Sequence, residues 1–302
     1  RQPGSSIKPI TYAFGFDQKL FTPATILADK STCFLSPEQE PYCPQNYDIQ
    51  FHGPTAIRFA LGNSFNIPAV KALVINGLEN FIASSSAFGI QGWTDPKLFG
   101  PSIALGGGEV TMLELATAYS VLANAGQRVD LNPILQVIDN TGKILESADL
   151  NKLADIDFKK VSLYHIALIN NQYYLPQNPQ NTRVISQGAA FLTTHILYDP
   201  GARAATFGSG SYLDIKGHPE VSVKTGTTND KRDNWTIGYN PDILAAVWVG
   251  NNDNTPMSNI ASGVTGASPI WNRIMSFALK DQNQRWPLQP SDVTGTLVCS
   301  FS

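Results

Sequence analysis

Three short groups of residues have the types and spacing needed for attack on a carbonyl group. Ser5 and Lys8 stand three positions apart in the opening stretch RQPGSSIKPI, Ser64 and Asn66 stand two apart in GNSFN, and Lys224 begins the tripeptide KTG. A Ser-x-x-Lys pair alone arises by chance roughly once in 300 positions, whereas a fixed tripeptide is expected only about 0.06 times in a chain of this size. All three groups in this order therefore indicate one catalytic constellation.

The first pair supplies a nucleophile and a base. Pro9 has no amide hydrogen, so a helix over residues 7–17 must begin near Ser5 or Ser6, which puts Ser5 at a helix N-terminus. Residues three apart share a helix face, so Lys8 can take the proton of the Ser5 hydroxyl. A free lysine has a pKa of about 10.4, so burial or a second cation must lower the pKa of Lys8.

The other two groups complete the reaction. Lys224 can be the second cation that lowers the pKa of Lys8, and it can attract a substrate carboxylate. Ser64 can relay a proton to the leaving amine, while Asn66 can hold the amide of the substrate. These residues and the first pair form the expected catalytic set.

The strand that carries the tripeptide has further expected roles. Gly226 has no side chain, so this strand can run close to the nucleophile. The amides of Ser5 and Thr227 can form an oxyanion hole. The hydroxyls of Thr225 and Thr227 can bind the substrate carboxylate, so Thr225, Gly226 and Thr227 are the expected substrate-binding residues.

Composition excludes several other classes of function. The 302 residues carry a net charge of -3, which gives no basic surface for nucleic acid. The longest apolar run, residues 243–249, is too short to cross a bilayer. The four histidines show no ligand spacing, and residues 106–108 (GGG) lack the lysine of a phosphate loop. We therefore expect no metal site, and a tight turn at the three glycines.

The helices and strands that must position these residues follow from periodicity and turn signals. Thr111 and Glu114 form a capping box that predicts a helix ended by Gly126. Further helices are predicted over residues 54–61, 68–74, 187–198 and 268–279, the last with Trp271, Ile274 and Phe277 on its apolar face. Residues 22–47 are predicted to be irregular.

β-Branched and aromatic residues predict strands later in the chain. A hairpin is expected over residues 134–138 and 143–145, and an antiparallel meander over residues 220–227, 234–239 and 243–250. Residues 170–181 are rich in Asn, Gln and Pro, which predicts a surface loop. Helices followed by an antiparallel sheet, with no internal repeat, predict an α+β fold.

The cysteines bear on the cellular compartment. Cys33 and Cys43 bracket LSPEQEPY, where a disulfide would fit an exported protein, although two unrelated thiols fit the spacing equally well. Because both lie in a loop typical of exported proteins, we predict that they are bonded or close enough to bond. Cys299 has no partner that the sequence identifies.

A family resemblance extends beyond the three groups. The segments RQPGSSIKP, ALGNSFNIPAVK, ALGGGEVTMLELATAYSVLANAG, VKTGTTNDKRDNWTIGY, AAVWVGNND and GASPIW resemble the transpeptidase domain of class A penicillin-binding proteins, the bifunctional peptidoglycan synthases. The resemblance covers residues 1–280. It implies a penicillin-binding-protein and serine β-lactamase-like fold, an antiparallel sheet flanked by helices, with no cofactor.

The resemblance also implies a reaction and a location. Ser5 would attack the D-Ala-D-Ala end of a peptidoglycan stem peptide, release the terminal D-Ala and pass the acyl group to an amine on a neighbouring strand. β-Lactam antibiotics mimic that terminus and stay attached to the serine. The site would face the periplasm, on the outer face of the bacterial cytoplasmic membrane, and the parent protein would carry a membrane anchor and a glycosyltransferase domain.

This sequence departs from the family pattern at its ends. From the resemblance we expect the family's glycosyltransferase domain, its membrane anchor and the sheet strands that precede the nucleophile helix to lie outside this sequence. We therefore expect a transpeptidase domain over residues 1–280, truncated at its N-terminus, and an extended tail over residues 281–302 that starts a further segment. The sheet edge beside residues 243–250 should be bare, covered by residues 293–298 or paired with another chain.

Related enzymes and receptors are the alternatives. A class A β-lactamase is disfavoured because 160 residues separate Ser64 from Lys224 and no Glu-x-x-Leu-Asn stretch is present. A D,D-carboxypeptidase uses the same groups with water as the acceptor, so the sequence leaves it open. A β-lactam-sensing receptor domain fits the surrounding segments less well than a synthase does, and a degenerate module conflicts with the intact groups.

Overall fold

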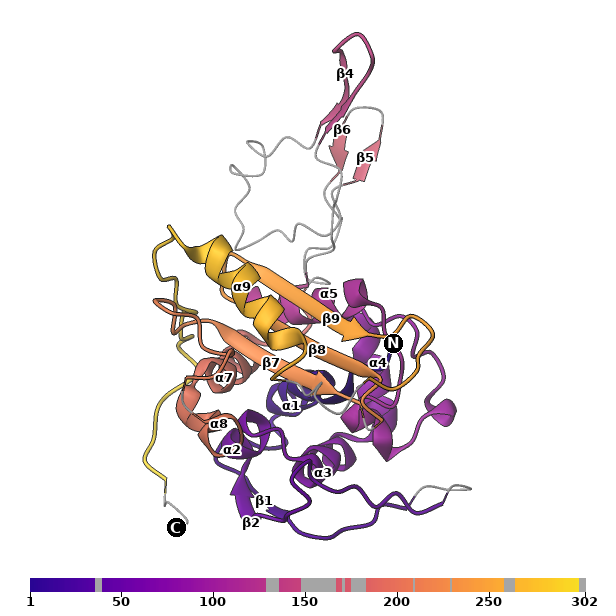
Figure 1. The fold of residues 1–302 in the computed structure, drawn as a ribbon, viewed down its shortest axis with the longest axis vertical. Helices are drawn as coiled ribbons and strands as arrows, with labels where there is room; N and C mark the ends of the chain where they lie inside the picture. The colour runs from indigo at the N-terminus through magenta and orange to yellow at the C-terminus, as the bar shows by residue number, and fades with distance from the viewer. Residues whose placement is uncertain are drawn as a thin grey trace.

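A three-stranded antiparallel sheet forms the centre of the molecule. The computed structural model describes residues 1–35, 40–128, 136–147, 167–169, 172–174, 183–208, 210–228, 230–257 and 264–298 (Figure 1). The sheet has the order β7-β8-β9, with β7 at Ser222–Thr227, β8 at Asp233–Tyr239 and β9 at Leu244–Gly250. The predicted meander and the α+β class are confirmed.

Helices cover both faces of this sheet. One face packs against α1 (Lys8–Asp17), α5 (Met112–Ala123) and α7 (Gln187–Tyr198), and the other against α9 (Ala267–Leu279). Figure 1 shows α9 lying across the near face, with α1 and α7 behind the sheet. Side chains alternate along each strand, so the two faces belong to two separate apolar clusters.

Shorter elements surround these layers. The helices are η1 (Gly4–Ile7), α2 (Ile57–Gly62), α3 (Asn66–Asn76), α4 (Leu78–Ala87), η2 (Pro96–Leu98), η3 (Pro101–Leu105) and α8 (Pro200–Phe207). Three antiparallel pairs join β1 (Ile26–Asp29) to β2 (Gly53–Ala56), β3 (Gln136–Ile138) to β4 (Ile144–Ser147), and β5 (Ala167–Ile169) to β6 (Gln172–Tyr174). In the part of the chain described here, no helix is long and apolar enough to cross a bilayer.

Local sequence signals are confirmed where the chain makes its own contacts. The capping box forms, because the Thr111 hydroxyl accepts from the Glu114 amide and the Glu114 carboxylate accepts from the Thr111 amide. Gly126 follows α5 with φ of +90°, and α7 has the predicted bounds. Cys33 and Cys43 form a disulfide, as predicted. Cys299 and most of residues 170–181 lie outside the described residues.

Strand pairing overrides two of the predictions. Residues 53–56 form β2 instead of the start of a helix, and residues 26–29 form β1 inside the segment predicted to be irregular. Pro54 is tolerated because β2 is an edge strand. A residue without an amide hydrogen can stand in an edge strand without breaking a bond of the ladder. Helices α4 and α8 were not predicted, and Gln172–Tyr174 is a strand where a loop was expected.

The predicted apolar face of α9 is also wrong. Trp271 is fully buried, but Ile274 is 46% exposed and Phe277 is 84% exposed. The buried positions after Trp271 are Met275 and Leu279, at spacings of four. A spacing of three turns each side chain about 60° away from the starting face, whereas a spacing of four turns it only about 40°. Ile274 and Phe277 therefore point away from the sheet.

Strand β9 is an edge strand of the described sheet. It pairs with β8 along its length, and no other described strand lies on its far side. The described part of the tail forms no strand, and Val293 lies near Gly188 at the start of α7. Within the described residues no strand from the tail or elsewhere pairs with this edge, and its pairing with another chain stays a prediction.

Candidate active site

The segment that carries Ser5 is held between a helix and the sheet. Ser5 lies in the single turn η1, which leads directly into α1. The Tyr119 hydroxyl of α5 donates to the Ser6 carbonyl at 2.6 Å, and the Trp235 indole of β8 donates to the Gln2 carbonyl at 2.9 Å. These bonds fix the backbone on both sides of Ser5.

Close backbone packing requires glycine at two positions beside Ser5. Gly4 has φ of +55°, and a Cβ there would lie 2.7 Å from the carbonyl oxygen of Thr227. A Cβ on Gly226 would lie 2.3 Å from the Pro3 carbonyl oxygen and 3.0 Å from the Ser6 Cβ. Because real Cβ atoms do not approach so closely, only glycine allows η1 and β7 to pack at this separation.

Lys8 is fully buried, one turn of helix after Ser5. Its Nζ donates to the Ser64 carbonyl at 2.6 Å, to the Ser64 Oγ at 3.3 Å and to the Asn66 Oδ1 at 2.6 Å. Burial holds the pKa of Lys8 well below its ordinary value, the charge of Lys224 lowers it further, and the charge of Asp29 opposes both effects. This environment favours a neutral amine.

Ser64 adopts a strained backbone conformation between α2 and α3. Its φ is +65°, a region that side chains other than Asn and Asp rarely occupy. The Phe65 amide bonds to the Ala60 carbonyl, and α3 begins at Asn66. The turn therefore presents Ser64 to both lysines, and such strain gathers at functional sites.

Lys224 approaches Ser64 from the sheet. Its Nζ donates to the Ser64 Oγ at 2.8 Å and to the Thr225 carbonyl at 2.9 Å. Burial lowers the pKa of Lys224 to about 7. Lys224 and Gly226 lie two apart on β7, so both face the nucleophile segment.

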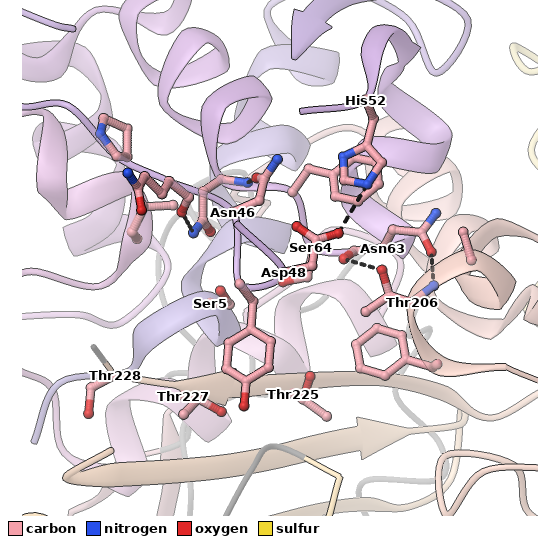
Figure 2. Close-up of a pocket in the computed structure, with 18 of the residues that line it drawn as sticks. Ser5, Asn46, Asp48, His52, Asn63, Ser64, Thr206, Thr225, Thr227 and Thr228 are labelled. Atoms are coloured by element: carbon pink, nitrogen blue, oxygen red, sulfur yellow. Dashed lines mark hydrogen bonds and ion pairs between the residues drawn. The ribbon is translucent and has the colours of Figure 1, made fainter. Parts of the chain in front are cut away.

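A cavity of about 720 Å³ opens beside these residues. Figure 2 shows Ser5 and Ser64 between Asn46 and His52 above them and Thr225 and Thr227 of β7 below them, with Asp48 beside Ser64. The lining also includes Asn63, Asn66, Thr206, Thr228 and Lys231. This volume lies in the range of small-molecule and peptide sites.

The structure brings the expected site residues together with one difference in bonding. Among the described residues the Ser5 hydroxyl makes no hydrogen bond, and the Lys8 amine bonds to Ser64 and Asn66 instead. Asn66 also donates from Nδ2 to the Gln45 carbonyl at 2.6 Å, so both ends of its amide bind the protein. The expected Ser5 to Lys8 bond is therefore not formed in this arrangement.

Sequence reasoning missed the wall of the cavity opposite the sheet. Asn46, Asp48 and His52 come from the loop between β1 and β2, where no motif marks them. Their only sequence signal is the alternation of polar and apolar residues in NYDIQFH, residues 46–52, directly ahead of β2. Within the described residues no group of three or more His, Cys, Asp or Glu side chains is placed to hold a metal ion.

Comparisons with known proteins agree with this geometry. The family model for the penicillin binding protein transpeptidase domain matches residues 1–276. Penicillin-binding protein 1A of Pseudomonas aeruginosa is 31% identical over 322 residues, covering 99% of this chain and 38% of that protein. Penicillin-binding protein 2D of Bacillus subtilis is 29% identical over 304 residues, covering 99% of this chain and 39% of that protein. The chain thus spans under two fifths of the length of these relatives.

Solved structures show the same fold. The crystal structure of penicillin-binding protein 1A from Haemophilus influenzae matches 96% of this chain and 44% of its own, with a TM-score of 0.75 and 28% identity. The PonA1 protein from Mycobacterium tuberculosis, in complex with penicillin V, matches 97% of this chain and 73% of its own, with a TM-score of 0.71 and 19% identity. At this lower identity the second match shows the fold alone.

Proposed function

Because this chain belongs to the penicillin-binding protein transpeptidase family, we propose that Ser5 is acylated by the D-Ala-D-Ala end of a peptidoglycan stem peptide. The acyl group then passes to an amine on a neighbouring strand, which forms the cross-link. We further propose that residues 1–280 form this catalytic domain and that residues 281–302 are a tail outside it.

One observation carries this proposal. Two buried lysines from different elements, Lys8 on α1 and Lys224 on β7, both donate to the Ser64 hydroxyl beside a cavity that Ser5 lines. Two buried lysine amines at one hydroxyl have no packing purpose, because burying each polar group costs free energy. They do provide a proton path, because burial lowers the pKa of both amines.

In the acylation step the neutral Lys8 amine takes the Ser5 proton while Oγ bonds to the carbonyl carbon. The amides of Ser5 and Thr227 stabilise the resulting oxyanion. The bond to the terminal D-Ala nitrogen then breaks, and the Ser64 hydroxyl passes the proton from Lys8 to that nitrogen. Lys224 attracts the substrate carboxylate, and the hydroxyls of Thr225 and Thr227 bind it.

The second step reverses these transfers. The acceptor amine attacks the ester carbon, loses a proton to Lys8, and the bond to Ser5 Oγ breaks as Oγ regains a proton. A β-lactam enters the first step in the same way, since its ring amide opens on Ser5. Its ring nitrogen stays tethered to the acyl group, which keeps the acceptor away.

We also propose where the site lies in the cell and which further parts the longer protein carries. The disulfide between Cys33 and Cys43 supports an oxidising compartment, because disulfides persist outside the cytoplasm. We place the site at the outer face of the bacterial cytoplasmic membrane. The class A relatives support a parent with a membrane anchor and a glycosyltransferase domain.

An exchange assay tests the proposed reaction. The protein is incubated with a peptide ending in D-Ala-D-Ala and a second D-amino acid, and the products are separated by mass. We expect the unsubstituted chain to exchange the terminal residue and the Ser5→Ala variant to show no exchange. Release of D-Ala without exchange would make the protein a carboxypeptidase, and β-lactam acylation without either product would make it a sensor.

A further inference from the structure

A fully buried carboxylate lies behind the catalytic lysine and outside the three motif groups. Asp29, the last residue of β1, accepts three hydrogen bonds on its Oδ2: from Asn46 Nδ2 at 2.7 Å, from the His52 amide at 2.9 Å and from His52 Nδ1 at 2.8 Å. Its Oδ1 has no hydrogen-bond partner among the described residues. A buried carboxylate that is only half satisfied is costly, so its retention needs a reason.

Asn46 carries the effect of Asp29 toward the site. Its Nδ2 donates to Asp29 and to the Gln50 carbonyl at 2.8 Å. Its Oδ1 accepts from the Asn66 amide at 2.7 Å, at the first residue of α3. Helix N-terminal amides have no partner within the helix, so Asn46 fixes the start of α3.

Asn66 completes the path to the base. Its Oδ1 accepts from Lys8 Nζ at 2.6 Å, and its Nδ2 donates to the Gln45 carbonyl at 2.6 Å. A continuous chain of three bonds of 2.6 to 2.7 Å thus links Asp29, through Asn46 and Asn66, to the Lys8 amine.

We propose that Asp29 is a positioning residue for acyl transfer: through Asn46 it fixes Asn66, and through Asn66 it sets the position of the Lys8 amine beside Ser64. This proposal rests on the proposed function of Ser5 and Lys8. Asp29 does not itself line the cavity, so it acts through its hydrogen-bond partners Asn46 and His52, which do.

The same carboxylate holds the wall of the cavity opposite the sheet. The His52 ring bonds to Asp29 through Nδ1 and to Asp48 Oδ2 through Nε2 at 3.1 Å, and it stacks on Phe65 with ring centroids 3.9 Å apart. Figure 2 shows Asn46 and His52 on this wall. Asp29 therefore links the position of the lysine and of this wall to the end of β1.

The charge of Asp29 gives the proposal a readout that packing alone lacks. The titratable groups around Asp29 are Lys8 and Tyr12 on α1, Lys71 on α3 and His52 on the loop. The charge of Asp29 raises the pKa of Lys8, against burial and Lys224. Removing this charge destabilises protonated Lys8, so the pH at which Lys8 loses its proton falls.

Three variants separate position from charge. The measurement is the rate constant for adduct formation with penicillin, followed by intact mass from acid to alkaline pH. An unfolded fraction does not alter this rate constant. Asn46→Ala breaks the series of hydrogen bonds but keeps the charge of Asp29. Asp29→Asn removes this charge but keeps an oxygen that can accept from Asn46. Asp29→Ala does both.

We expect Asn46→Ala and Asp29→Ala to slow acylation about 10- to 100-fold, as for hydrogen-bond partners that orient metal ligands. Asp29→Asn should recover most of the rate. Both Asp29 variants should move the acid limb of the profile to lower pH, and Asn46→Ala should leave it in place.

Glu220→Gln is the matched control. Glu220 is also a buried carboxylate bonded to a histidine, His218 Nδ1 at 2.9 Å, but its charge does not act on Lys8 or Lys224. It should keep the parental rate constant and acid limb. Parental rates and acid limbs in Asn46→Ala and both Asp29 variants would overturn the proposal, as would an equal effect of Glu220→Gln. If penicillin did not acylate the unsubstituted chain, that result would instead overturn the proposed function on which the proposal rests.

Discussion

The two faces of the central sheet differ in what they bury. On the α9 face, Val223 of β7 and Val247 of β9 pack against Trp271 in an apolar cluster. On the opposite face the next residue of β7, Lys224, buries an amine against Ser64. Since neighbouring strand residues point to opposite faces, one strand serves folding with one set of side chains and chemistry with the other.

This difference shows where the fold gives up stability. The α9 face is closed by apolar side chains whose burial stabilises the folded state. The site face retains the buried amines of Lys8 and Lys224 and the left-handed backbone of Ser64, each of which costs free energy. Substitutions on the two faces should therefore have opposite signatures in activity and in stability.

The largest effect is expected from removing the base on the site face. Lys8→Met should slow acylation by penicillin about 10²- to 10⁴-fold, the usual contribution of a general base. The rate constant is measured by intact mass under excess penicillin. A rate within threefold of the parent chain would remove Lys8 from the mechanism.

The matching substitution on the α9 face should reverse this pattern. Trp271→Ala should lower the free energy of unfolding by about 3 to 5 kcal/mol, because the Trp271 side chain is fully buried and its loss leaves a cavity. Acylation by the molecules that remain folded should keep the parental rate constant. Phe277→Ser is the control on the same helix: Phe277 is 84% exposed, so the change in stability should stay within about 0.5 kcal/mol. Equal losses of stability would restore Phe277 to the apolar face.

Close packing on the site face predicts a smaller loss. Gly226→Ala places a Cβ against the Pro3 carbonyl and Ser6, so η1 must move away from β7. We expect destabilisation of about 1 to 3 kcal/mol, as for overpacking, together with slower acylation. Gly295→Ala is the control, since nothing lies within 4 Å of a Cβ there. Parental stability and rate in Gly226→Ala would contradict the close approach of β7 to the nucleophile.

The last prediction is a change in how stability depends on pH. The folded pKa of Lys224 is about 7, below the unfolded value of about 10.4, so the unfolded chain binds more protons between these pH values. This group therefore makes parental stability rise with pH across that window. Lys224→Met lacks the group, so its thermal midpoint relative to the parent should be higher at pH 6 than at pH 10. A pH-independent difference would mean that Lys224 has an ordinary pKa when folded.

The residues that gather at the proposed site were easier to identify from the sequence than the residues that support them. Ser5, Ser64 and Lys224 stand out because the proposed reaction requires these residue types at these spacings. Asp29 and Asn46 were missed because their contact joins the last residue of β1 to a loop residue 17 positions later. Such a contact depends on pairing between distant residues, which periodicity does not report.

The errors in the fold have the same origin. Pro54 favours a helix start locally, but pairing with Ala28 places it in a strand. On α9, Phe277 fits an apolar pattern by type, and only packing against the sheet shows that Met275 is buried instead. Helix α5 was predicted correctly because its capping box and stop signal lie within its own sequence.

The proposed reaction depends on a covalent acyl-enzyme at Ser5. The direct test is intact mass after exposure to penicillin, followed by proteolysis and mapping of the modified peptide. We expect one added penicillin on each protein molecule, located on Ser5, and no adduct on Ser5→Ala. An adduct that persists in Ser5→Ala, or one that maps to Ser64, would contradict it.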